Sequence, residues 1–140
     1  MGFRHTETVR FGHVDGAGIV FHPRYCEWVN NTIEAWFSDG IGYSFTDLHL
    51  RDGHAIPLLE SHYAFRKASR LGDVLTFTLT VTEMKRATFD VRIVCTGPEG
   101  DERMSADIRM VHVRLEPMKS ADIPDWLRAK MEAFRAAPRD

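Results

Sequence analysis

One predicted helix is apolar over so much of its circumference that it needs other structure around it. It begins near His22, because Pro23 suits the first helical position, and it ends at Gly40 and Gly42. Its apolar stripe is made of Tyr25, Val29, Ile33, Trp36 and Phe37, and Trp28 and Ala35 widen it. A chain with such a helix has to fold around it.

The rest of the chain is mostly β-rich. Four segments rich in Val, Ile, Thr and Phe follow the helix, at residues 56–65, 74–82, 88–95 and 104–115. Short connections separate them, which is typical of neighbouring antiparallel strands. The remaining pieces are a short strand at 6–11, a loop or helical turn at 43–52, and an amphipathic helix at 123–137 after a possible cap at Asp122.

This order of elements predicts the α+β class, with helices segregated from an antiparallel sheet. A five-stranded sheet curled around the long central helix accounts for the pattern, and a C-terminal helix completes it. That arrangement is the hotdog fold. We expect one such domain over residues 1–140. Its unpaired edge strands make pairing across a dimer plausible.

Composition excludes several classes of function. Hydrophobic residues make up 44% and charged residues 27% of the 140 residues, as in an average soluble domain, so function must come from particular side chains. A net charge of −2 argues against bulk nucleic-acid binding. Cys26 and Cys95 match no metal or redox motif, and both are expected to be buried thiols. No apolar leader or membrane span is present, so we expect a cytoplasmic protein.

The densest motif is residues 11–25, Phe-Gly-His-Val-Asp-Gly-Ala-Gly-Ile-Val-Phe-His-Pro-Arg-Tyr. It resembles the signature of the 4-hydroxybenzoyl-CoA thioesterase family of hotdog proteins, and looser similarity runs through 57–60 and 68–75. The resemblance implies an acyl-CoA thioesterase that needs no metal or other cofactor. Its substrate is an aromatic, 4-hydroxybenzoyl-like acyl-CoA or a short-chain one, cleaved to the free acid and CoA.

In the family, the motif's aspartate is the nucleophile or general base, and a backbone N–H at the helix start polarises the thioester carbonyl. By position these roles fall on Asp15 and on the main chain of His22. The chemistry suits the residues, because a thioester needs a base or nucleophile near carbon and donors near oxygen. Gly16 and Gly18 allow close approach of a ligand to the backbone. An isolated aspartate there is more often a cap or turn former, so the whole motif carries the prediction.

Other substrate contacts are implied less directly. His22 stands where the family has Tyr or His, and its ring either takes part in proton transfer or packs beside Tyr25. Asn30 replaces an acidic residue that contacts the phenol hydroxyl in the 4-hydroxybenzoyl enzyme, and an amide can still hydrogen-bond a hydroxyl. Glu60 is a candidate helper for Asp15, although a strand glutamate is usually solvent-facing. The predicted substrate-binding residues are Gly16, Gly18, Tyr25, Asn30 and Glu60.

The predicted coenzyme A contacts are basic and hydroxyl side chains, namely Lys85, Arg86, Thr88 and Arg70. A basic turn of this kind is ordinarily a solvated edge, and only the resemblance favours phosphate binding. Two rival functions stay open: a hotdog dehydratase, and a non-catalytic module that binds acyl-CoA or acyl carrier protein. The resemblance also implies a homodimer or a homotetramer, with sites at subunit interfaces.

Overall fold

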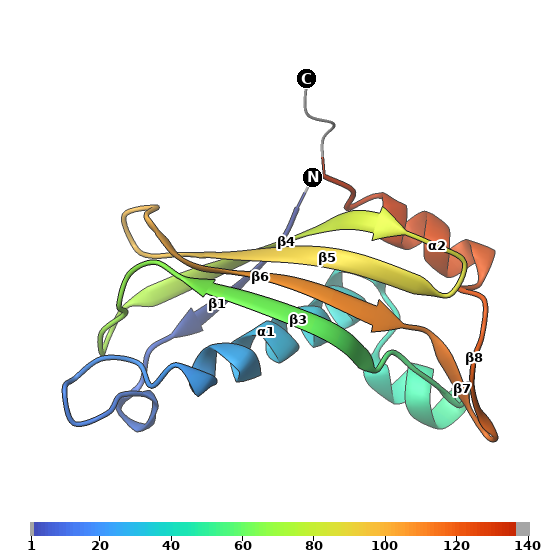
Figure 1. Cartoon of the computed structure of the whole chain (residues 1–140), viewed down its shortest axis with the longest axis horizontal. Helices are drawn as coiled ribbons and strands as arrows, with labels where there is room; N and C mark the ends of the chain where they lie inside the picture. Colours follow the sequence, from blue (N-terminus) through green and yellow to red (C-terminus); the bar gives the residue numbers. More distant parts are fainter. Residues whose placement is uncertain (1, 137–140) are drawn as a thin grey trace.

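The computed structural model describes residues 2–136. A five-stranded antiparallel sheet in the order β1-β4-β5-β6-β3 curls over one long helix, α1 (Figure 1). The strands are β1 (Phe3–Thr8), β3 (Leu58–Phe65), β4 (Val74–Met84), β5 (Thr88–Thr96) and β6 (Glu102–Val111). The predicted α+β architecture, a curled sheet around a central helix, is confirmed.

The core lies between α1 (Pro23–Ala35) and the concave face of the sheet. The alternation of Thr with apolar residues in β4 puts Leu75, Phe77, Leu79 and Val81 on that face, where all four are fully buried. The Trp28 ring of α1 meets the Phe77 ring edge-on at 6.1 Å. The wide apolar stripe of α1 therefore packs against the sheet, as the sequence predicts.

The central helix does not stop at Gly40. It continues as a wider π-helical turn, η2 (Trp36–Ile41), which Gly42 ends with a left-handed φ of 83°. Gly40 serves packing instead, because a Cβ there would lie 2.9 Å from the Trp36 side chain and 3.1 Å from that of Phe3. A second π-helical turn, η3 (Asp47–Arg51), lies within the segment predicted as a loop or short helical turn.

The last predicted strand is two strands in two sheets. β6 ends at Val111, and β7 (Val113–Leu115) joins a small separate sheet between β2 (His54–Ala55) and β8 (Met118–Ser120). The break falls at buried His112, whose N–H donates to the carbonyl of Ala87 at 2.7 Å rather than to a strand of the large sheet.

The prediction that strands joined by short connections are neighbours is wrong for β3 and β4. β3 pairs with β6 at one edge of the sheet, whereas β4 pairs with β1 and β5. Residues 66–73 form a crossover between the two strands. The segment between β1 and α1, which includes the short helix η1 (Phe11–His13), holds this crossover, because the N–H of Val20 donates to the Ser69 carbonyl at 2.9 Å.

The C-terminal helix is confirmed but is shorter than predicted. α2 (Asp125–Glu132) begins after Pro124, so Asp122 does not cap it and instead pairs with Arg86. Leu127 and Met131 bury its apolar side. The end of the predicted helix, at residue 137, lies outside the described residues. No described helix has the length and apolar character to cross a membrane.

Candidate active site

Asp15 lies in a tight loop that enters α1. Its N–H donates to the carbonyl of Ile19 at 2.9 Å, and its own carbonyl accepts the N–H of Gly18 at 3.0 Å. The exposed carboxylate uses Oδ1 to accept the N–H of Ala17 at 2.8 Å. This is the turn-forming role considered above, and it leaves the second oxygen, Oδ2, without a partner among residues 2–136.

The helix start, where the resemblance predicts a backbone donor, has one N–H group without an acceptor among the described residues. The N–H groups of Arg24 and Tyr25 already donate to the carbonyls of Phe21 and His22, at 2.9 and 3.1 Å. The N–H of His22 itself has no acceptor within the described chain. It is therefore free to meet an oxyanion beside the Asp15 loop.

The His22 side chain is exposed and lies among aromatic rings. Its ring is 5.4 Å from that of Phe21 and 6.1 Å from that of Phe65, at the end of β3. No hydrogen bond joins it to Asp15 in the part of the chain that the structure describes. Both interpretations of His22, packing and proton transfer, remain compatible with this placement.

Tyr25 lies behind the loop, in the core. Its hydroxyl donates to Ser69 Oγ at 2.8 Å, and its ring meets the Trp28 ring edge-on at 5.4 Å. Burial raises the pKa of the Tyr25 hydroxyl, although the hydrogen bond to Ser69 acts in the opposite direction. The Tyr25 side chain thus links the first turn of α1 to the crossover, on the core side of the Asp15 loop.

A buried arginine underlies the same region, and sequence reasoning missed it. Arg103 is only 7% exposed, and its guanidinium donates to Asp101, Asp73 and Ser69 at 2.7, 2.9 and 3.1 Å. The guanidinium bond lowers the pKa of Asp101 to about 2. The pKa of Asp73 is also lowered, first by the hydrogen bond from the backbone N–H of Arg70 and then by the one from the Arg103 side chain. Arg103 falls just outside the predicted strand, which starts at residue 104.

An apolar cavity of about 350 Å³ opens beside α1. Its walls include Asn30 and Ile33 from α1, Phe45 and His49 from the helical segment that includes η3, and Ile56 and Pro57 ahead of β3. Asn30 is eight residues beyond His22, or roughly 12 Å along the helix. The cavity has the size and lining of a pocket for a small apolar group, and its polar side chains are Asn30, Glu34 and His49.

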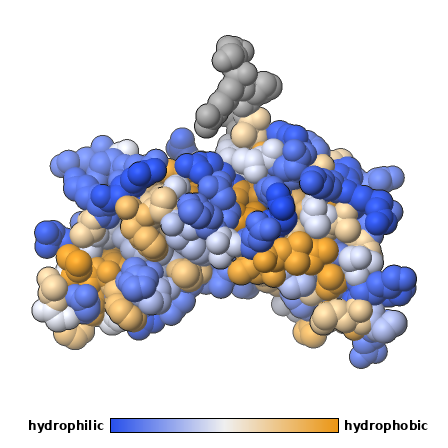
Figure 2. All heavy atoms as spheres, viewed as in Figure 1, coloured by the Kyte–Doolittle hydropathy of each residue, from blue (hydrophilic) through white to orange (hydrophobic). Residues whose placement is uncertain are grey.

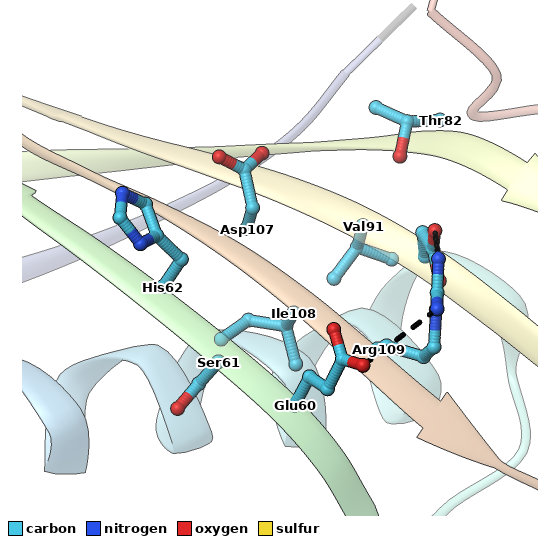
Figure 3. Close-up of a pocket in the computed structure, with 9 residues that line it drawn as sticks. Glu60, Ser61, His62, Thr82, Val91, Asp107, Ile108 and Arg109 are labelled. Carbon is cyan, nitrogen blue, oxygen red and sulfur yellow. Dashed lines mark hydrogen bonds and ion pairs between the residues drawn. The ribbon is translucent and has the colours of Figure 1, made fainter.

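Glu60 lies away from this cavity, on the outer face of the sheet (Figure 3). Its carboxylate is 3.9 Å from Arg109, whose guanidinium is held by both oxygens of Asp90 at 2.9 and 3.0 Å. The side chain is 73% exposed. Within one chain, the structure does not bring Glu60 to Asp15.

The predicted coenzyme A contacts divide between the two ends of the sheet. Arg70 lies in the crossover, paired with Ile19 of the Asp15 loop. Lys85, Arg86 and Thr88 lie at the β4–β5 turn, at the far end of β4, which is roughly 30 Å away because β4 has 11 residues (Figure 1). A site that uses both groups has to take them from two chains.

No three His, Cys, Asp or Glu side chains gather into a metal site anywhere in residues 2–136.

The sequence predicts that both cysteines are buried, and this is wrong for one of them. Cys95 is buried in β5, but Cys26 is exposed on α1.

The model of the thioesterase-like superfamily matches residues 9–131. The chain belongs to this superfamily. The match spans the Asp15 loop, α1 and every strand of the large sheet except β1, so the predicted membership of a thioesterase family is confirmed, as is the prediction of a thioester hydrolase. This thioesterase-like chain is also 27% identical, over 81% of its length and 82% of the relative's, to 1,4-dihydroxy-2-naphthoyl-CoA hydrolase from Acaryochloris marina.

Solved structures share the fold of the thioesterase-like chain. A Staphylococcus aureus protein in complex with CoA has a TM-score of 0.90 at 17% identity, over 99% of this chain and 89% of that one. The 4-hydroxybenzoyl-CoA thioesterase of Pseudomonas sp. strain CBS-3 has a TM-score of 0.83 at 23% identity, over 92% and 98%. A Synechocystis 1,4-dihydroxy-2-naphthoyl-CoA thioesterase has a TM-score of 0.85 at 22%, over 94% and 96%. The hotdog fold is confirmed.

Proposed function

We propose that this chain hydrolyses an aromatic acyl-CoA to the free acid and CoA, with Asp15 as the catalytic carboxylate. The observation that carries the proposal is the placement of Asp15 in a thioesterase-family loop, with one free carboxylate oxygen, directly ahead of a helix whose first N–H is unused. The carboxylate is the base or nucleophile, and the N–H of His22 is the donor for the carbonyl oxygen.

Two routes use the same carboxylate. As general base, Asp15 takes a proton from water, the hydroxide adds to the carbonyl carbon, and the tetrahedral intermediate expels the CoA thiolate, which then takes the proton. As nucleophile, the carboxylate itself attacks, the CoA thiolate leaves and takes up a proton, and water hydrolyses the resulting mixed anhydride. In both routes negative charge develops on the carbonyl oxygen beside the helix start.

The apolar cavity supports an aromatic acyl group rather than a short chain. Its volume of about 350 Å³ suits a ring system, and the side chain of Asn30 at its rim can hydrogen-bond a ring hydroxyl. Three of the similar proteins described above have names that give an aromatic substrate, either 1,4-dihydroxy-2-naphthoyl-CoA or 4-hydroxybenzoyl-CoA. We therefore propose a hydroxylated aromatic acyl group for this chain.

Thiol release from a panel of aromatic and short-chain acyl-CoAs, by wild type and by Asp15→Asn, tests the proposal. The asparagine Oδ1 can still accept the N–H of Ala17, so the loop should keep its shape while the charge is lost. We expect turnover of an aromatic acyl-CoA to fall at least about 100-fold.

Full activity in Asp15→Asn would remove Asp15 from the mechanism. No thiol release by wild type from any acyl-CoA would favour the binding module instead, and water addition to an enoyl thioester would favour the dehydratase. Faster turnover of short-chain than of aromatic acyl-CoAs would overturn the acyl assignment.

We also propose that two chains associate along β3. This strand is an edge of the sheet, and it exposes Leu58, Leu59 and Phe65. Figure 2 shows hydrophobic atoms at the surface where β3 begins and β6 ends. An open, apolar edge strand is a template for pairing with a second copy. Association of chains is also what a site containing both Arg70 and Lys85 requires.

A further inference from the structure

The guanidinium of Arg103 is the centre of a buried hydrogen-bond network, and all its partners lie outside the strands of the sheet. Arg103 is the second residue of β6 and lies at an irregularity in its pairing with β5, and its partners come from the crossover and from the β5–β6 turn. Besides the two carboxylates and Ser69, its Nη1 donates to the carbonyl of Ala68 at 3.1 Å. Its backbone carbonyl accepts the N–H groups of Arg66 and Lys67, at 2.9 and 3.2 Å. One residue thus holds the crossover by both its main chain and its side chain.

The chain is built to accept this side chain. Gly97, in the β5–β6 turn, lies under the guanidinium, and a Cβ at that position would stand 2.3 Å from Arg103 Nη2. No other residue type can occupy position 97 without moving the arginine. The carboxylates of Asp73 and Asp101, which both accept hydrogen bonds from the guanidinium, balance its charge.

The crossover in turn holds both ends of the Asp15 loop. At the entry, the N–H of Val9 donates to the carbonyl of Asp73 at 2.8 Å, and the carbonyl of Val9 accepts the N–H of Gly72 at 2.9 Å. At the exit, Ile19 pairs with Arg70, and the N–H of Val20 donates to the carbonyl of Ser69 at 2.9 Å.

The Ser69 hydroxyl joins the crossover to the helix as well. Its Oγ accepts both the Tyr25 hydroxyl, at 2.8 Å, and Arg103 Nη1, at 3.1 Å. A continuous chain of hydrogen bonds therefore runs from β6, through the crossover, to the loop and to the first turn of α1.

We propose that Arg103 is a positioning residue that fixes the Asp15 carboxylate relative to the helix start, acting through Ser69 and Asp73. The inference rests on the proposed function, in which the distance between that carboxylate and the His22 N–H decides the rate. Small displacements of a reacting group cost rate without a matching cost in substrate binding, which is the effect we assign to Arg103.

Two variants test this role, with Arg109→Lys as the control. Arg103→Lys keeps the positive charge but cannot reach Ser69, Asp73 and Asp101 together. Ser69→Ala is milder and removes only the shared hydroxyl. Arg109 also lies on β6 and is also bonded to a carboxylate through two nitrogens, but its partner Asp90 has no link to the loop.

The first readout is amide hydrogen exchange, which does not depend on activity. In both variants we expect exchange at Ala17 and Val20 to accelerate at least about 10-fold, while amides in the centre of β4 stay protected. Arg109→Lys should leave all of them unchanged. The positioning role of Arg103 is wrong if hydrogen exchange at the loop amides stays as slow in Ser69→Ala and Arg103→Lys as in wild type. It is also wrong if exchange accelerates equally at the loop amides and at the β4 amides.

The second readout is the split between kcat and KM on the best acyl-CoA. We expect kcat to fall roughly 10- to 100-fold in Arg103→Lys, and less in Ser69→Ala, with KM changed by less than about twofold. A loss confined to KM would overturn the positioning role. If wild type hydrolyses no acyl-CoA, the proposed function fails, and the exchange data still decide whether Arg103 orders the loop.

Discussion

His112 combines burial with an ionisable ring, at the point where the large sheet gives way to the small one. Its Nδ1–H donates to the carbonyl of Ala121 at 3.0 Å, and its Nε2 has no partner among the described residues. The ring of His54 lies 4.8 Å away. Burial, and to a lesser extent His54, lowers the pKa of His112, while the bond to Ala121 opposes the shift.

The stability of the fold should therefore decrease in mild acid. Because its pKa is lower in the folded than in the unfolded chain, His112 takes up a proton on unfolding below about pH 6.5, and this favours the unfolded state. In His112→Asn the amide can still donate to Ala121 but cannot titrate. We expect urea midpoints to fall between pH 7.5 and 5.5 by more in wild type than in His112→Asn. Equal falls would show that His112 does not contribute.

At the scale of elements, the sequence predicts faces better than partners. The alternation in β4 and the stripe of α1 each identify a buried side, because side-chain periodicity is local. Which strand lies beside β3 depends on contacts far away in the chain, and no periodicity encodes them. The break at His112 is hidden for a similar reason, since apolar residues flank it on both sides and the pattern reads as one strand.

The candidate site shows the same division. Its central loop could be predicted, because the aspartate, the glycines and the helix start are contiguous in sequence. The Arg103 network could not, because its members come from residues 25 to 103 and only their packing joins them. For Lys85 and Arg86 the sequence predicts a shared site with the Asp15 loop, but position in the sequence does not show that the two lie at opposite ends of the sheet.

The two glycines of the Asp15 loop should separate backbone shape from ligand access. Gly18 has a left-handed φ of 78°, whereas Gly16 does not, and both have open space where a Cβ would stand. Gly18→Ala should cost about 1–2 kcal/mol in unfolding free energy, and Gly16→Ala close to nothing. Thermal unfolding together with kinetics checks this. A Gly16→Ala protein that is stable but slow would show that substrate approaches the backbone there. An equal loss of stability in both variants would contradict the assignment.

For the whole molecule, the open edge at β3 is the feature that decides assembly. A charge placed on that edge should oppose pairing with a second copy, because pairing would bring a charged lysine from each copy into the interface. We expect Leu59→Lys to sediment as a smaller species than wild type at about 10 μM. Leu71→Lys is the matched control, because both leucines are 53% exposed but Leu71 lies in the crossover. Identical sedimentation of all three proteins would exclude β3 as the interface.

The unequal burial of the two cysteines affects how turnover of a CoA thioester can be counted. Burial raises the pKa of the Cys95 thiol to about 12, so at neutral pH it is shielded and is not a thiolate. Cys26 is exposed on α1, the helix that follows the Asp15 loop. A colorimetric reagent that reports released CoA by its sulfhydryl group will also label this residue. Its signal will thus start from one equivalent per chain, and the label itself will sit one residue beyond Tyr25. Replacing Cys26 with serine gives a silent background.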